Sequence, residues 1–300
     1  MKRITVLSGK GGTGKSTISS SLAVLLSRNM GIVAVDCDVD APDLGLCLGV
    51  KDKDYQWNPV ETGYKAKLIE KECTHCGKCC NICRFGAISW NKEKNQPIFN
   101  RLLCEGCGSC KLICPIGAIK LVKVENGRIG YAKSKYGFNI VTGQLKMGES
   151  GSGKIVLLIK NKAEELAHKE NAEIILVDSA AGIGCPVIAS VNGSDYVIAV
   201  TEPTPSALSD LKKSLEVVKH FKIPYGLIIN KFDINKEFSK KIEKFAKDNN
   251  IPLLGKVPYS KEFVSALVNL TPVVVWNKNF EPIFEGIIKN LDLLRGKTNP

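Results

Sequence analysis

The sequence is short of three features that would assign it to common classes of protein. No stretch of its 300 residues approaches the ~20 consecutive apolar residues of a membrane span, so we expect no membrane insertion. Its three histidines, His75, His168 and His220, are scattered and match no catalytic triad. The first apolar segment, Ile4 to Leu7, continues into a glycine-rich loop without a cleavage-site pattern, so we expect a cytoplasmic protein.

The chain is basic, yet it carries no recognised nucleic-acid-binding module. Its formal net charge of +12 counts each of the twelve cysteines as neutral. Eight of these cysteines form two dense runs of the same spacing, and in a chain without an export pattern this favours metal ligation over disulfides. If eight thiolates hold two iron–sulfur clusters, the charge falls to about +8. The lysines are spread as on a solvated surface, so we expect no nucleic-acid partner.

Short β-branched runs alternate with helical patterns along most of the chain. The near-continuous apolar runs predict an α/β fold, with a parallel sheet covered by helices on both faces. A helix is expected over Lys15–Arg28. The expected strands are Arg3–Ser8, Ile32–Asp36, Glu173–Asp178, Tyr196–Thr201, Tyr225–Asn230, Leu253–Val257 and Val273–Trp276.

An internal repeat interrupts that rhythm between about residues 52 and 147. Its period is 31 residues, and it maps Cys73, Cys76, Cys79 and Cys83 onto Cys104, Cys107, Cys110 and Cys114. The repeat indicates a small domain inserted into the larger one. We therefore expect a parallel-sheet domain formed by residues 1–60 and 142–300, with a small α+β domain at 65–125.

Residues 9–16, GKGGTGKS, match the phosphate-binding pattern G-x-x-x-x-G-K-[ST] between a predicted strand and a predicted helix. Glycines allow backbone N–H groups to curl around phosphate oxygens, and the following helix adds its positive N-terminal end. Lys15 is expected to reach the β- and γ-phosphates, and the Ser16 hydroxyl to hold Mg²⁺. The pattern predicts a nucleoside triphosphate site formed by Gly9, Lys10, Gly11, Gly12, Thr13, Gly14, Lys15, Ser16 and Thr17.

The string GKGGTGKST, with its early Lys10, resembles the deviant Walker A motif of the MinD-like P-loop ATPases. That superfamily includes nitrogenase reductase, ParA and the Mrp-type iron–sulfur carriers, and the resemblance extends over the whole chain. It implies ATP hydrolysis and a homodimer in the ATP state, in which Lys10 reaches across to the partner's phosphates. It gives Lys10 and Lys15 catalytic roles.

Two acidic segments resemble the switches of the same superfamily. Asp38 falls where those ATPases place the carboxylate that positions the attacking water. Asp178 would hold Mg²⁺ through water, and the N–H of Gly182 would sense the γ-phosphate. The family usually has two prolines before that glycine, whereas this chain has Ala180 and Ala181, which implies a looser loop.

The identity of the base is open on the sequence alone. Asn230-Lys231-Phe232-Asp233 follows a predicted strand and matches NKxD, the guanine-reading motif of GTPases. In the MinD-like ATPases an asparagine at this strand end reads adenine, and a segment resembling Val257-Pro258-Tyr259 flanks it. Lys10 and the switch sequences favour ATP or ADP, with Asn230 and Pro258 at the base, and GTP is the alternative.

The pattern C-x₂-C-x₂-C-x₃-C occurs twice and is the signature of a bacterial two-cluster ferredoxin. A cubane takes three thiolates from one tight loop, and the fourth cysteine of each run ligates the other cluster. One 4Fe–4S cluster is therefore expected on Cys73, Cys76, Cys79 and Cys114, and the other on Cys104, Cys107, Cys110 and Cys83. Zinc is the alternative, since CxxC pairs also bind it.

Two further features leave alternatives open. Cys185 lies seven residues after Asp178, at the offset of a bridging-cluster ligand in nitrogenase reductase, but Phe138–Val156 offers no second cysteine. The alternative to a bridging cluster or transient metal site is a cysteine at a helix start without a redox role. The CPxC pair of the Mrp-type carriers is also missing, because Ile188 stands at its last position. The apolar positions from Phe280 to Leu294 follow helical spacing, which favours a last helix packed on the sheet over a membrane-targeting helix.

Three functions follow from this reading. In the first, an ATP-driven dimer switch gates electron transfer from the clusters to an acceptor protein. In the second, the nucleotide controls the handover of a labile cluster by an iron–sulfur carrier. In the third, the chain is a positioning or regulatory switch whose clusters sense redox state.

Overall fold

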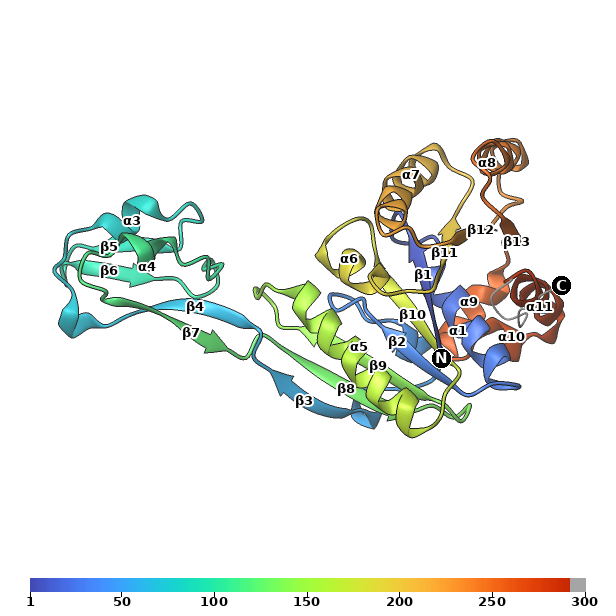
Figure 1. Cartoon of the computed structure of the whole chain (residues 1–300), viewed down its shortest axis with the longest axis horizontal. Coiled ribbons are helices and arrows are strands. Elements are labelled where there is room, and N and C mark those ends of the chain that lie inside the picture. Colours follow the sequence, from blue (N-terminus) through green and yellow to red (C-terminus); the bar gives the residue numbers. More distant parts are fainter. Residues whose placement is uncertain (292–300) are drawn as a thin grey trace. The chain divides into compact units, whose positions relative to one another are not determined.

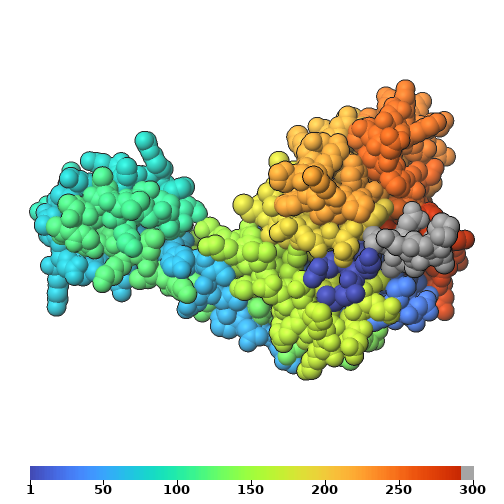
Figure 2. Space-filling view, viewed as in Figure 1, coloured from blue at the N-terminus to red at the C-terminus, as the bar shows by residue number. Residues whose placement is uncertain are grey.

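The computed structural model describes residues 1–291 of the chain, which divide into two compact units. The larger unit comprises Met1–Trp57, Ile129–Gln144 and the chain from Ser152 on. The smaller unit comprises Asn58–Arg128 and Leu145–Gly151, and its atoms, cyan to green in Figure 2, form one body.

The larger unit is built on a nine-stranded sheet with the order β13-β12-β11-β1-β10-β2-β9-β8-β3. The seven strands from β13 to β9 in that order pair in parallel, so their carboxyl ends meet along one edge. The strands are β1 Lys2–Ser8, β2 Ile32–Asp36, β3 Gln56–Val60, β8 Gly127–Lys133, β9 Asn139–Leu145, β10 Ile174–Ala181, β11 Tyr196–Thr201, β12 Tyr225–Asn230 and β13 Leu253–Val257.

Helices cover both faces of this sheet (Figure 1), as the sequence predicts. The helices are α1 Lys15–Ser27, α2 Leu44–Cys47, α5 Ser152–Lys169, α6 Cys185–Val191, α7 Pro205–His220, α8 Lys236–Asp248, α9 Lys261–Val268, α10 Val273–Trp276 and α11 Glu281–Lys289.

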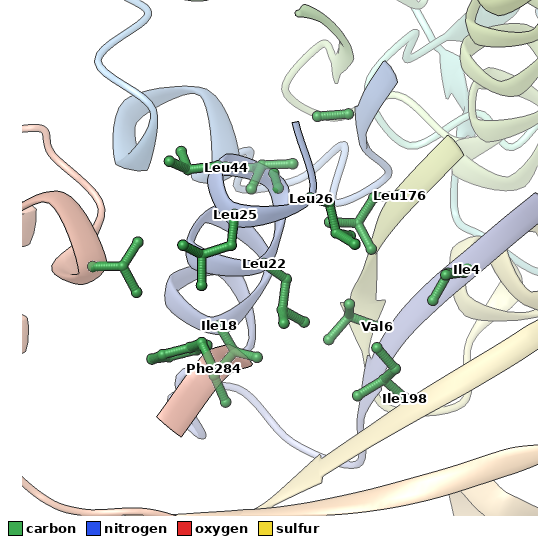
Figure 3. Packing of buried hydrophobic residues seen from close by; sticks show 14 of the residues in the cluster. Ile4, Val6, Ile18, Leu22, Leu25, Leu26, Leu44, Leu176, Ile198 and Phe284 are labelled. Carbon is green, nitrogen blue, oxygen red and sulfur yellow. The ribbon is translucent and has the colours of Figure 1, made fainter. Parts of the chain in front are cut away.

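Alternation along each strand supplies the two layers of the core. Ile4 and Val6 of β1 pack with Leu22 of α1 and Phe284 of α11 (Figure 3), whereas Leu7 packs in a cluster formed by α6 and α7. A strand buried on both faces must be apolar at successive positions, which explains why β1 shows no polar alternation.

Six of the seven predicted strands are confirmed, and Val273–Trp276 is not a strand. This segment forms the short helix α10, in which the N–H groups of Val275 and Trp276 both donate to the carbonyl of Pro272. Its β-branched residues favour a strand locally, but α10 buries Val273 and Val274 in the core. Tertiary packing therefore outweighs local propensity here. The pattern of apolar runs in the sequence did not indicate strands β8 and β9.

The predicted last helix is confirmed as α11, whose Phe284 and Ile287 are buried on the core beside the sheet. Leu294, the end of the predicted apolar pattern, lies outside the described residues. Within residues 1–291, no helix has the length and apolar character to cross a membrane.

The smaller unit is built from two similar halves. Helix α3, Lys78–Ile82, corresponds to α4, Ser109–Ile113, at an offset of 31 residues. Strand β4, Gly63–Leu68, pairs antiparallel with β7, Ile119–Val124, and β5, Ile88–Asn91, pairs antiparallel with β6, Gln96–Phe99. The pair Leu68–Ile119 therefore corresponds to the pair Phe99–Ile88. Strand β4 leads into the first half and pairs with β7, which follows the second half. Strand β6 leads into the second half and pairs with β5, which follows the first. The halves are therefore interlocked.

Candidate functional site

The phosphate loop lies between β1 and α1 and has a curled backbone. Gly12 and Gly14 have φ angles of 78° and 87°, a conformation that favours glycine. Gly14 also has no room for a side chain, because an added Cβ would lie 2.2 Å from Nδ2 of Asn230. Helix α1 begins at Lys15, directly after this turn, so its free N–H groups face the loop. This is the form of an anion-binding site.

Lys15 is buried and forms an ion pair with Asp178 on the central strand β10. Its Nζ lies 3.0 Å from Oδ2 of Asp178, whose Oδ1 accepts a 2.6 Å hydrogen bond from the hydroxyl of Ser19. Burial alone lowers the pKa of Lys15, but the charges of Asp178 and then Asp36 outweigh it and leave that pKa raised. Lys15 is thus a positive charge at the base of the loop.

The carboxylates after β2 shape the same end of the sheet. Asp36 is fully buried and accepts hydrogen bonds from the backbone N–H groups of Asp38, at 3.1 Å, and Leu44, at 2.9 Å. Burial, followed by the nearby charge of Asp178, raises the pKa of Asp36. Asp38 is half-buried, accepts from the N–H of Ala41 at 3.3 Å, and has a pKa raised by burial. Asp36 therefore holds the turn that positions Asp38.

Lys10 is held at the mouth of the loop by a carboxylate that the sequence analysis did not identify. Its Nζ lies 2.9 Å from Oε1 of Glu202, and Oε2 of the same side chain lies 2.9 Å from Nζ of Lys231. Lys231 also donates to the carbonyl of Gly12 at 2.9 Å. We call Glu202, Lys10 and Lys231 the lysine clamp. It ties the loop to the ends of β11 and β12.

Two residues predicted to contact the nucleotide have hydrogen-bond partners within the protein. Nδ2 of Asn230 donates to the carbonyl of Thr13 at 2.7 Å, and its Oδ1 accepts from the N–H of Lys231 at 2.9 Å. The N–H of Gly182 donates to the carbonyl of Ser8 at 3.0 Å, with φ at 94°. The single N–H of Gly182 must leave Ser8 before it can serve a γ-phosphate, whereas the Asn230 amide keeps a second N–H and a second lone pair for a base.

The remaining predicted nucleotide residues lie on the same edge of the larger unit. Gly9 is closely approached by α7, because an added Cβ would lie 2.3 Å from the carbonyl carbon of Asp210. Gly11 is exposed, and Ser16 and Thr17 lie half-buried in the first turn of α1. Pro258 follows β13, and its neighbour Tyr259 donates its N–H to Oδ1 of Asp233 at 2.7 Å. In NKxD, Asp233 is thus used to hold the chain after β13.

The smaller unit contains two hollows, each lined by four cysteines. The first is lined by Cys73, Cys76, Cys79 and Cys114. The second is lined by Cys83, Cys104, Cys107 and Cys110. Each has a volume of about 330 Å³, including space open to solvent. The grouping is the one predicted, including the exchange of the fourth cysteine between the runs.

Four cysteines around one space are a donor set that a 4Fe–4S cubane can use. In residues 1–291 no three or more Cys, His, Asp or Glu side chains converge closely enough to hold one metal ion. A tetrahedral zinc site requires such convergence, at about 2.3 Å from each sulfur. A 4Fe–4S cubane distributes four thiolates over four irons, so its ligands surround a space.

Local geometry forms each hollow in the same way. Gly77 and Gly108, with φ angles of 71° and 82°, precede the helices α3 and α4 that carry Cys79 and Cys110. These two cysteines are buried, and burial raises the pKa of both thiols. Free thiols in these positions are therefore protonated at neutral pH, and ligation must displace a proton from each.

The fold and the loop geometry agree with the comparison to known proteins. A sequence profile for the CobQ/CobB/MinD/ParA nucleotide binding domain matches residues 4–273. The chain belongs to this family. An uncharacterized protein of Methanocaldococcus jannaschii is 44% identical over 78% of this chain and 79% of its own length. The iron-sulfur cluster carrier protein of Pyrococcus furiosus is 24% identical over 98% of this chain and 88% of its own.

Solved structures agree on the fold. The septum site-determining protein MinD of Pyrococcus horikoshii, complexed with Mg-ADP, matches with a TM-score of 0.58 at 19% identity. The match covers 98% of this chain and 97% of MinD. The predicted resemblance to MinD-like P-loop proteins is thereby confirmed for the fold and the family.

In this CobQ/CobB/MinD/ParA-type chain, the residues that sequence reasoning missed share one property. Glu202, Asp36 and Ser19 act through partners distant in sequence or through backbone N–H groups, so no local motif marks them. One signal was available: Glu202 directly follows β11, at the edge where the carboxyl ends of the parallel strands meet. Cys185 is exposed at the start of the seven-residue helix α6.

Proposed function

We propose that this member of the CobQ/CobB/MinD/ParA family is a Mg²⁺-dependent ATPase and an iron–sulfur protein. Its nucleotide cycle would close and open a homodimer and so control electron transfer through two 4Fe–4S clusters to a partner protein. The observation that carries the proposal is the combination, in one chain, of the Lys15–Asp178 phosphate loop with two hollows of four cysteines each.

The nucleotide half of the proposal follows from the charges at the loop. An incoming triphosphate competes with Asp178 for Lys15, and the released carboxylate can then hold Mg²⁺ through water, together with the hydroxyl of Ser16. Asp38, on its turn beside Lys15, would position the attacking water. Lys10, once free of Glu202, would reach the phosphates bound by the partner subunit.

The iron–sulfur half follows from the cysteine hollows. Cys73, Cys76, Cys79 and Cys114 would hold one cluster, and Cys83, Cys104, Cys107 and Cys110 the other. Such clusters supply one-electron transfer at low potential. The exchange of the fourth cysteine interlocks the halves of the unit. The electron would pass from these clusters to a partner protein.

A cluster carrier is the second candidate, and one observation favours it. The Pyrococcus furiosus relative that matches 98% of this chain is named an iron-sulfur cluster carrier protein. The positions of the cysteines argue against a carrier. The CPxC pair expected of the Mrp-type carriers is absent from the segment that begins at Cys185. Eight cysteines that surround two spaces favour clusters that stay in place.

One anaerobic preparation can separate these functions. The full chain is purified without oxygen and assayed for iron, sulfide and nucleotide. Dithionite-reduced protein is then mixed with candidate partners, with and without ATP. We expect ATP-dependent re-oxidation with no loss of iron. Transfer of iron to an apo-acceptor would instead establish the carrier, and a colourless, zinc-loaded protein would contradict both.

Cysteine variants supply the matched control. Cys79→Ser should lose about half of the iron, because Cys79 lines the first hollow. Its neighbour Cys80 lies in the same helix but has Lys111 as its counterpart in the repeat. Cys80→Ser should therefore retain full iron and sulfide. Equal loss in both variants would show that the assignment of ligands is wrong.

A further inference from the structure

The two cysteine hollows are related by the repeat but are not equivalent in their surroundings. The difference lies on the strand that enters each half. Lys65 and Ala66 of β4 correspond, at the 31-residue offset, to Gln96 and Pro97 of β6. Ala66 lines the second hollow and Pro97 the first. These two differences between the halves alter both the hydrogen bonding and the charge at one side of each hollow.

The first difference is a hydrogen bond to sulfur. The backbone N–H of Ala66 donates to Sγ of Cys104 at 3.4 Å. Pro97 has no N–H, so the corresponding bond to Cys73 cannot form. The N–H of His75 also donates to Sγ of Cys73, and Sγ of Cys107 lies 3.5 Å from the hydroxyl of Ser109, in a hydrogen bond for which either group can be the donor. On the strand that enters each half, the second hollow therefore has an amide donor that the first lacks.

The second difference is a buried charge. Lys65 is 5% exposed, and its Nζ donates to the carbonyl of Cys104 at 2.8 Å. Nζ also lies 3.1 Å from Oε2 of Glu149, whose Oε1 lies 3.8 Å from Nε of Arg101. The group of Lys65, Glu149 and Arg101 carries one net positive charge. Lys65 is the member in direct contact with a predicted cluster ligand.

At the corresponding positions, the first hollow has less positive charge than the second. Gln96 is neutral where Lys65 is positive, and Glu70 stands where the second half has Arg101. Glu70 is exposed, so water and salt screen its charge. Lys65 is screened much less because it is buried.

Two exposed charges in the linings differ in the other sense: Lys78 lines the first hollow where the second has Ser109, and Glu105 lines the second where the first has Thr74. Water and salt screen both of them. The buried charge that distinguishes the hollows is therefore the Lys65 ammonium.

We propose that the cluster held by Cys83, Cys104, Cys107 and Cys110 has a higher reduction potential than the cluster held by Cys73, Cys76, Cys79 and Cys114. The inference rests on the proposed function, since it requires both clusters. Each cluster gains one negative charge when it accepts one electron from a one-electron donor. A buried cation and an N–H···S bond both stabilise that charge.

The consequence is a direction for electron flow. In a chain reduced by one electron, the electron resides on the cluster beside Lys65. An electron that enters at the first cluster moves to the second by a favourable step, with no bond made or broken. The second cluster is then the one that holds the electron for the acceptor. Lys65 is a positioning residue in this scheme, because it acts through the ligand Cys104.

The test is a redox titration of the full-length, anaerobically purified chain, followed by electron paramagnetic resonance. Wild type should show two separate one-electron steps. Lys65→Gln should reduce the preference of the electron for the second cluster by about tenfold, equivalent to lowering the upper step by about 59 mV for a one-electron couple. The lower step should not move.

Two further variants make the test specific. Lys67→Gln removes an exposed lysine two residues along the same strand, and it should leave both steps unchanged. Pro97→Ala restores an N–H beside Cys73 and should raise the lower step. If Lys65→Gln fails to assemble its clusters, Pro97→Ala still tests whether the strand beside each hollow sets the reduction potential of its cluster.

The outcomes that overturn the inference are distinct from failure of the proposed function. Iron and sulfide for two clusters, with a single shared potential in wild type, would refute the inference and leave the proposed function standing. A shift of the lower step in Lys65→Gln would do the same. A wild-type protein without iron would refute the proposed function, and the inference with it.

Discussion

At the scale of single residues, the nucleotide site is a set of charges whose partners a triphosphate would replace. Lys15 is paired with Asp178, and Lys10 and Lys231 share Glu202. Buried or half-buried charges cannot be left without a partner, because desolvation is costly. Protein carboxylates therefore satisfy these lysines in the nucleotide-free chain. Nucleotide binding must exchange one set of oxygens for another.

The lysine clamp leads to a prediction about affinity. Glu202→Gln removes the carboxylate that competes with phosphates for Lys10 and Lys231. We expect ATP to bind about tenfold more tightly, which corresponds to about 1.4 kcal/mol. Isothermal titration of the nucleotide-free protein measures this directly. Glu216→Gln, which removes an exposed helix carboxylate paired only with Lys219, should leave the affinity unchanged. Weaker binding by Glu202→Gln would show that the clamp assists the nucleotide.

The same clamp has a defined pH dependence. Burial alone would raise the pKa of Glu202, but hydrogen bonds from Lys10 and Lys231 lower it below its ordinary value of 4.5. The contribution of the clamp is therefore present above pH 4.5 and is lost as the pH falls through the lowered pKa. The difference in affinity between wild type and Glu202→Gln should disappear over that acidic range.

At the scale of elements, the loops beside the cysteines depend on glycine in two different ways. Gly106 and Gly117 have similar φ angles, 65° and 69°. An added Cβ at Gly106 would lie 2.1 Å from the carbonyl oxygen of Tyr64 on β4. At Gly117, no heavy atom of the described chain lies within 4 Å of that position. Backbone strain is thus common to both sites, and a steric clash is specific to Gly106.

These two glycines form a matched pair for mutation. Gly117→Ala should cost only the strain of a left-handed alanine, about 1 kcal/mol, and retain its iron. Gly106→Ala must also displace β4 from the loop that carries Cys104 and Cys107, and it should lose iron from the second hollow. Iron content and the visible absorption of the anaerobic protein report the difference. Equal retention in the two variants would show that the loop can move away from β4 at little cost.

Elements also show where local patterns are insufficient. The run Val273–Trp276 has the composition of a strand and forms α10, because Val273 and Val274 fill the core from a helical turn. Strands β8 and β9 join the sheet in a stretch whose apolar rhythm is weak. Strong, fully buried strands such as β1 and β10 were predictable, since burial on both faces imposes an apolar run.

At the scale of the whole molecule, the proposed switch requires two chains. Lys10 lies at the mouth of the phosphate loop. Its predicted target is the triphosphate bound by the partner chain, not the one bound by its own. We expect Asp38→Ala, which should bind ATP without turnover, to form a dimer with Mg²⁺ and ATP. Adding Lys10→Ala should leave it monomeric. Sedimentation velocity at matched nucleotide concentration measures both states.

The control for the dimer is an exposed lysine outside the loop. Lys213, which pairs with Asp210 on α7, can be changed to alanine in the Asp38→Ala background. That variant should still dimerise with ATP. If the Lys10 double variant dimerises equally well, Lys10 does not bridge the two subunits, and the implied role of this residue is wrong.

The sequence by itself determined the features that depend on neighbours along the chain. The phosphate loop, its lysine and the spacing of the two cysteine runs are local, because one tight turn holds a phosphate and one tight loop supplies three of the four thiolates of a cubane. Even the two groups of four cysteines could be predicted from the repeat, and each group lines one hollow. That they ligate clusters stays a prediction.

Only the tertiary structure decided which distant residues act on these local sites. Glu202 reaches Lys10 across 192 residues of sequence, Asn230 and Gly182 are already engaged with the loop, and Lys65 lies against Cys104. The physical reason is that a buried charge or amide acts through whichever group packs against it. Packing joins residues that no spacing rule relates, so the electrostatics of both sites could be read only from the folded chain.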